Sequence, residues 1–190
     1  MEQSADTFLH LLLNDFESGF GLRMGKVVYE CDLYSTALDL AAERQKLRLS
    51  AVDRAKVAFR AAYALEYAFF LNRELFISKY LDSFIETFPL TKNRSAHRHF
   101  GKMMTILLRS KCVIFSPEQA SIIAETAAIW LADPKTRVAV QAWALEILTL
   151  LAPQVAWIAE VLPDAIGLLS LNPTPAMKVR LRRHSLPIGI

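Results

Sequence analysis

Glycine is scarce in this chain, with 6 in 190 residues, and the dipeptides Asn-Gly and Asp-Gly, which favour tight hairpin turns, do not occur. Apolar residues instead recur three and four positions apart along almost the whole chain, which is the spacing of a buried helix face. These two features argue against a sheet-rich fold. The sequence therefore predicts an all-α protein.

The chain also has few cysteines and no basic N-terminal segment. Cys31 and Cys112 are far apart and belong to no metal or redox motif, so we expect two reduced thiols. The first residues, M-E-Q-S-A-D-T-F, carry acids where a signal peptide needs basic residues. We therefore expect a cytoplasmic protein.

A long uninterrupted apolar run is absent as well. The most apolar part, 138–171, contains Glu146, Glu160 and Asp164 and is broken by Pro153. A membrane-spanning helix needs about 20 predominantly apolar residues in a row. We therefore expect no membrane association.

Prolines lie where helices should begin. Ser116-Pro117-Glu118-Gln119 combines a capping serine, a proline at the first helical position and a capping-box glutamine, and Asp133-Pro134 repeats the cap and the proline. Pro163 lies inside a helical pattern and should kink or divide that helix. Together with the apolar spacing, these signals predict helices near 4–16, 27–44, 50–71, 74–88, 93–110, 117–132, 135–151 and 154–170. Gly19, Gly21 and Gly25 should mark the loop between the first two helices, and an irregular basic tail should begin at Asn172.

The chain repeats itself at a distance. A-Y-A-L-E at 62–66 returns as A-W-A-L-E at 142–146, and halfway between them Gly101 and Met104 replace the alanine and the leucine. A period of about 40 residues with two helices in each repeat is typical of HEAT or armadillo units, whose paired helices stack to bury a shared core. We therefore expect an α-α superhelix of antiparallel pairs, with one repeat domain over 1–175 and a basic tail over 176–190.

Three segments carry a resemblance to a known family. R-A-A-Y-A-L-E-Y (60–67), R-S-A-H-R-H-F-G-K-M-M (94–104) and V-A-V-Q-A-W-A-L-E-I-L (138–148) resemble successive first helices of a small HEAT-like family found mostly in Bacteroidetes-type bacteria. That family also tends to end in a proline and a basic tail, as P-A-M-K-V-R-L-R-R (175–183) does. The resemblance covers about 35–183 and implies the fold. Some members carry an adenylosuccinate lyase label, but this chain lacks the Ser-Ser-x-Met-Pro loop of that enzyme, so we do not transfer the activity.

The H-x-H at His97 and His99 invites a metal-site interpretation. Residues two apart on a helix point about 200° away from each other, so these two rings cannot chelate one ion from a single helix. We expect both to lie at the border between the apolar and polar faces, each with one edge in water. His10, His184 and the two cysteines form no ligand spacing. We therefore expect no metal and no cofactor.

The charge distribution gives the candidate binding residues. Residues 92–111 contain six Lys or Arg and no acid, whereas 117–133 contains three acids and no base. The candidates are the cations that a helical wheel places opposite the apolar face, together with those of the tail: Arg94, Arg98, Lys102, Arg109, Lys178, Arg180, Arg182 and Arg183. Either nearby acids such as Asp53, Glu118 or Asp133 neutralise them, or an external anion does.

Three functions remain open. We rank first a non-enzymatic scaffold that binds another protein, with self-association as one form of it, because no nucleophile–base or metal pattern is evident. Nucleic-acid binding through the basic helix and tail comes second. The net charge of +3 is small, and acidic second helices would oppose DNA in a concave groove. A lyase-type enzyme comes third, and we assign no catalytic residue.

Overall fold

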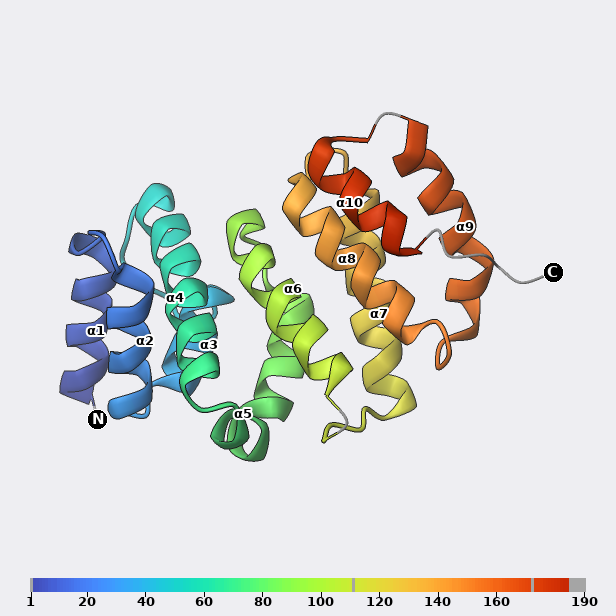
Figure 1. Ribbon diagram of the computed structural model, residues 1–190. Coiled ribbons are helices and arrows are strands. Elements are labelled where there is room, and N and C mark those ends of the chain that lie inside the picture. Colours follow the sequence, from blue (N-terminus) through green and yellow to red (C-terminus); the bar gives the residue numbers. More distant parts are fainter. Residues whose placement is uncertain (1, 111, 172, 185–190) are drawn as a thin grey trace. The chain divides into compact units, whose positions relative to one another are not determined.

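The computed structural model describes residues 2–110, 112–171 and 173–184, and within these ranges the protein is all-helical, as predicted (Figure 1). No strand is formed in the described ranges. The elements are α1 (Glu2–Asn14), α2 (Phe20–Glu30), α3 (Tyr34–Ala41), α4 (Ala51–Leu71), α5 (Arg73–Thr87), the 3-10 helix η1 (Phe88–Leu90), α6 (Arg94–Arg109), α7 (Pro117–Ala132), α8 (Val138–Leu151), α9 (Ala156–Leu171) and α10 (Pro175–His184). None of the described helices combines the length and the apolar character that crossing a membrane requires.

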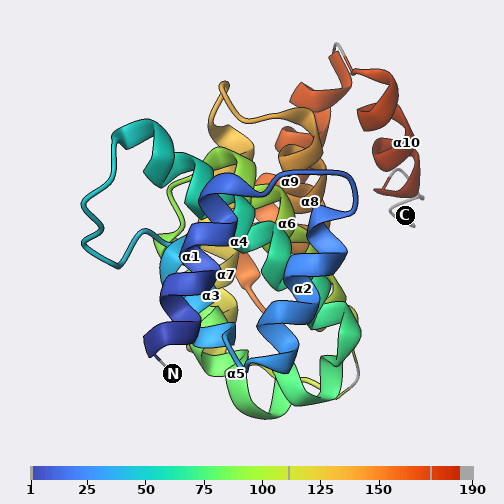
Figure 2. The ribbon, with the colours of Figure 1, turned by 90° about the vertical axis from the view of Figure 1, so that its left-hand side faces the viewer.

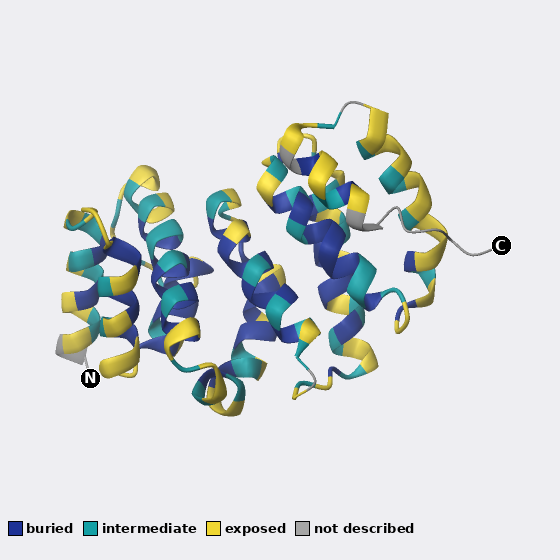
Figure 3. Ribbon diagram, viewed as in Figure 1, coloured by how far each residue is buried: buried dark blue, intermediate teal, exposed yellow. Residues whose placement is uncertain are grey.

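The chain forms two compact units, Met1–Met103 and Met104–Ile190, and the boundary falls inside α6. In the first unit α4 is the central helix, against which α1, α2 and α3 pack. In the second unit α8 packs against α7, α9 and α10. Buried residues follow the inward faces of both central helices (Figure 3).

The N-terminal part differs from the sequence prediction. The helix expected over 27–44 is two helices, because α2 ends at Glu30 and the chain turns through Asp32, whose φ of 54° is left-handed, before α3 begins. Gly21 and Gly25, expected in a loop, lie within α2 and are buried. A Cβ at Gly25 would lie 2.4 Å from Cβ of Tyr67, so glycine here permits close contact between α2 and α4.

The C-terminal part also differs. The segment predicted to be an irregular tail forms α10, whose Met177 and Leu181 are buried against Leu145 of α8. Proline suits the first position of a helix, and Met177 and Leu181 are four residues apart, so both lie on the side of α10 that packs, whereas Val179 is 53% exposed. Pro163 lies within α9 and does not divide it.

Local signals predicted α7 well. Ser116 accepts a hydrogen bond from the backbone N–H of Gln119, whose side chain in turn accepts from the Ser116 N–H, so the predicted capping box is formed. Leu65, Met104 and Leu145, predicted to occupy equivalent core positions, are each fully buried.

Candidate functional site

The predicted basic residues of α6 reach two buried carboxylates. Lys102 donates to Oε1 of Glu66 on α4, and Arg109 donates to Oε1 of Glu146 on α8. Both glutamates are about 95% buried, at 6% and 5% exposure. We expected any internal neutralisation to come from Asp53, Glu118 or Asp133. The acids that pair with Lys102 and Arg109 belong instead to the motifs that we assigned to core packing.

Glu66 is held by two groups on α6. Its Oε2 lies 2.6 Å from Nδ1 of His99, and Lys102 donates to the other oxygen while its Nζ lies 4.7 Å from the centre of the Phe70 ring. Burial alone would raise the pKa of Glu66, but the hydrogen bonds and positive charge of His99 and Lys102 outweigh it, so the pKa is lowered. An ionised carboxylate only accepts hydrogen bonds, so Nδ1 of His99 carries the hydrogen.

The two histidines differ from their predicted environment. His97 is 7% exposed and His99 is 5% exposed, so neither has an edge in open water. Nε2 of His97 lies 2.7 Å from the carbonyl oxygen of Thr91, whereas His99 faces Glu66. The helical wheel placed both rings at a border because it takes no account of α4, which covers the His99 side of α6. The two rings have different partners, as the helical geometry requires.

Glu146 in the second unit has a similar environment. Arg109 donates to Oε1, and Nη1 of Arg180 on α10 lies 3.5 Å from Oε2. The Arg180 guanidinium also lies 4.6 Å from the centre of the Trp143 ring, which is cation–π geometry. Arg180 therefore joins α10 to α8 through a charge contact and a ring contact, in addition to the apolar contacts of Met177 and Leu181.

The two environments share one arrangement. In A-Y-A-L-E and A-W-A-L-E an aromatic residue precedes the glutamate by three positions, so both lie on one side of the helix. A basic side chain from a later helix lies over each ring and reaches each glutamate. His99 lies 4.9 Å from Tyr63, and Arg180 lies over Trp143. We call this arrangement the aromatic–glutamate module. The feature of the sequence that could have indicated this module is the glutamate that ends each otherwise apolar motif.

The other predicted cations are at the surface. Arg94 and Arg98 on α6 and Lys178 and Arg182 on α10 are exposed. The side chain of Arg183 lies outside the described residues. The structure therefore divides the candidate set into three cations that contact buried glutamates and four that face solvent.

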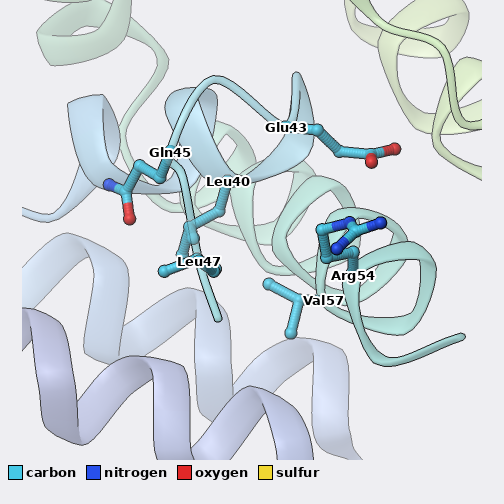
Figure 4. Close-up of a pocket in the computed structure, with 6 residues that line it drawn as sticks. All are labelled: Leu40, Glu43, Gln45, Leu47, Arg54 and Val57. Atoms are coloured by element: carbon cyan, nitrogen blue, oxygen red, sulfur yellow. The ribbon is translucent and has the colours of Figure 1, made fainter. Parts of the chain in front are cut away.

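The glutamates line neither of two cavities in the first unit. One cavity, lined by Leu40, Glu43, Gln45, Leu47, Arg54 and Val57, holds about 10 Å³ (Figure 4). That is room for about one water molecule, whereas small-molecule sites usually offer ~300 Å³ or more. A wider hollow of about 350 Å³ is lined by His10, Leu11, Asn14, Asp15, Glu17 and Arg23. There Arg23 is already paired with Asp15 at 2.8 Å.

In both modules, basic side chains neutralise a buried glutamate. Glu66 is ionised and already engaged by His99 and Lys102, so it is not positioned as a general base. Within the described residues, no three His, Cys, Asp or Glu side chains gather to hold a metal ion. The absence of a cofactor therefore stays a prediction.

Comparison with protein-family models, with curated proteins and with solved structures found no match. The resemblance to the HEAT-like family thus remains an expectation from the sequence motifs.

Proposed function

We propose that this protein is a non-enzymatic scaffold of the HEAT/armadillo class, in which antiparallel helix pairs form a right-handed superhelix, and that it binds another protein. The repeated aromatic–glutamate module supports the repeat. α6 supplies a basic group to the module of α4, and α10 supplies one to the module of α8. α10 therefore takes the role of a first helix of a further repeat.

The observation that carries protein binding is the outer face of α9. Ile158 is the only buried residue of this helix, and Leu162, Ile166 and Leu169 are partly buried against the α8–α10 core. On the opposite side Val161, Leu168 and Leu171 are 46%, 71% and 76% exposed. Their spacing of seven and three positions places them on one stripe. Exposed faces of helices usually carry polar side chains, and several large apolar residues exposed on one face are typical of an interaction site.

The charges of the second unit favour a protein ligand over a nucleic acid. Arg109 and Arg180 are paired with Glu146, which reduces the cationic surface available to phosphates. Glu160 and Asp164 are both exposed and would repel a phosphate backbone. Asp164 is three residues after Val161 and four before Leu168, so it lies on the same side of α9 as the apolar stripe. A surface that combines apolar and acidic side chains suits a partner surface with apolar and basic side chains.

Substitution of two exposed leucines of α9 tests the proposal. Leu168→Asp with Leu171→Asp should abolish capture of the partner from a lysate of the native organism, because two exposed apolar contacts become charged. The fold should persist, since substitutions at exposed sites usually change the free energy of unfolding by only about 0.5 kcal/mol. Ile114→Asp, at an isolated residue that is 94% exposed, is the matched control and should capture the same partner as the wild type.

Light scattering identifies the kind of partner. If the wild type is a dimer and the α9 variant a monomer, the partner is a second copy of the chain. If both are monomers and only the wild type and Ile114→Asp retain one captured protein, the partner is another protein. Equal capture by all three proteins would contradict the proposal.

A further inference from the structure

The loop between α3 and α4 carries a group of exposed cations that the sequence pattern did not indicate. Arg44, Lys46 and Arg48 are exposed, whereas the residues between them, Gln45 and Leu47, are half-buried. The backbone N–H of Leu47 donates to the carbonyl oxygen of Gln45 at 2.9 Å, so the chain makes a tight turn around Lys46 while one side of the loop lies against the protein. In Figure 2 the loop projects away from the neighbouring helices.

Apolar contacts hold the inner side of this loop. Leu47 lies with Leu40 and Val57 around the small cavity, and Arg54 borders the same cavity (Figure 4). Nη1 of Arg54 donates a 2.8 Å hydrogen bond to the carbonyl oxygen of Leu49, which ties the end of the loop to the first turn of α4. The outward direction of Lys46 and Arg48 is therefore set by the packing of their neighbours.

A second segment brings further positive charge. The Asn93 side chain donates a 2.8 Å hydrogen bond to the carbonyl oxygen of Ala55, so the start of α6 lies beside the first turn of α4. The exposed Lys92 precedes this contact. We call Lys46, Arg48, Arg54 and Lys92 the loop cations.

The loop cations have no ion-pair partner within the part of the chain that the structure describes. The neighbouring Arg44 and Lys56 do have acidic partners, Asp39 at 3.4 Å and Asp53 at 3.0 Å. Glu43 borders the same small cavity as Arg54 but forms no ion pair with it. Like charges placed together repel one another. This contrasts with Lys102, Arg109 and Arg180, each of which contacts a buried glutamate.

The surroundings indicate which anion fits. Val52, beside the loop, is 74% exposed, and a phosphate backbone offers nothing apolar to cover it. Asp53 precedes Arg54 in the first turn of α4, and its hydrogen bonds with Lys56 and Ser50 lower its pKa, so it stays ionised and opposes a uniformly negative ligand. A protein segment, by contrast, can place acids opposite the cations and an apolar residue opposite Val52.

The spacing agrees with this choice. Lys46 and Arg48 are two positions apart and both exposed, and alternate residues of an extended peptide, about 6.6 Å apart on one side, can place two acids opposite them. We infer that the loop cations bind an extended acidic segment of a partner protein. This inference rests on the proposed protein-binding function and adds to it a second surface, on the first unit, with a defined partner chemistry.

The experiment uses a probe that does not depend on finding the partner. A short labelled peptide in which glutamate alternates with serine around one central leucine is titrated with the full-length protein by fluorescence anisotropy at several salt concentrations. The wild type should bind it, and affinity should fall as salt rises. Lys46→Glu with Arg48→Glu should weaken binding by about tenfold or more, since two attractive charges become repulsive.

The chain offers a close control. Lys135 and Arg137 are exposed, have the same residue types and spacing, and immediately precede α8 as the loop precedes α4. Lys135→Glu with Arg137→Glu makes the same change in net charge and should leave the affinity within about twofold of the wild type. If both variants lost the same affinity for the peptide, the change in net charge alone would explain the result and the inference would be wrong.

Two further outcomes decide it. A peptide that the wild type does not bind, or that the loop variant binds equally well, would overturn the inference. A single-stranded oligonucleotide of equal charge is the comparison ligand. If the wild type binds it more tightly than the peptide and the loop variant does not bind it, the ligand is a nucleic acid and the inferred acidic protein segment is wrong. The α9 variant should bind the peptide normally. If the peptide does not bind, the proposal that α9 binds a partner is unaffected. If the α9 variant captures its partner as well as the wild type does, the inference about the loop cations is unaffected.

Discussion

The two buried glutamates occupy the same position of a repeated motif but have different cations. Glu66 faces a histidine and a lysine, whereas Glu146 faces two arginines. Arginine presents a planar group with several N–H donors, whereas lysine presents a single ammonium and histidine a ring nitrogen. One arrangement, a carboxylate buried beneath an aromatic ring and a basic side chain, is therefore formed in both motifs by different basic residues.

The largest effect is expected from truncating the leucine of each motif, which tests whether the two motifs are equivalent core positions. Leu65→Ala and Leu145→Ala should each lower the free energy of unfolding by ~2–5 kcal/mol, because both leucines are fully buried and truncation leaves a cavity. Denaturant melts measure this directly. A loss below about half a kcal/mol at either position would contradict the equivalence of the two motifs.

The glutamates themselves come next. Glu66→Gln and Glu146→Gln keep the size of the side chain but remove the charge-assisted hydrogen bonds, and each should cost roughly 1.5–3 kcal/mol. An exposed acid on α5, Asp82, provides the control as Asp82→Asn and should cost very little. If the glutamate variants behaved like this control, the modules would not contribute to stability.

Acid should remove the contribution of Glu66 to stability. The pKa of Glu66 in the folded protein is lowered from its ordinary value of 4.5, so the unfolded chain takes up the proton first as the pH falls. The stabilisation by Glu66 is therefore fully present above the unfolded pKa and is lost as pH falls through the folded pKa. In melts at decreasing pH, the gap in free energy of unfolding between wild type and Glu66→Gln should narrow below 4.5. A gap that stayed constant down to a pH of about 2 would contradict this assignment.

The smallest effect concerns the cation over the ring. Arg180→Lys keeps a positive charge but loses the planar contact with Trp143, and should cost about 0.5–1 kcal/mol. Protease cleavage within α10 should accelerate, because fewer contacts would hold that helix against α8. Arg182→Lys, at an exposed position of the same helix, should leave the cleavage rate unchanged.

Local patterns predicted most helices, and their failures have a common origin. The capping box of α7 depends on neighbouring residues and was predicted correctly. The start predicted at Asp133-Pro134 was wrong, because Asp133 ends α7, a turn follows at 134–135, and α8 begins only at Val138. Gly21 and Gly25 were expected in a loop because glycine usually weakens a helix. Both glycines instead allow Tyr67 of α4 to contact α2 closely. This role could not be predicted without knowing that α4 packs against α2. The C-terminal helix was missed because its polar composition hides two apolar anchors, Met177 and Leu181.

Periodicity and capping act over a few residues, so they were enough to predict that the chain is helical, where α7 begins, and that A-Y-A-L-E and A-W-A-L-E place leucines in the core. Which charges are buried depends on how the helices pack. Glu66 and His99 are separated by many residues, and a helical wheel sees one helix at a time. Their burial depends on a neighbouring helix that supplies both the apolar cover and the opposite charge. The same reasoning separates Lys102 and Arg109, which meet a buried carboxylate, from Lys46 and Arg48, which do not.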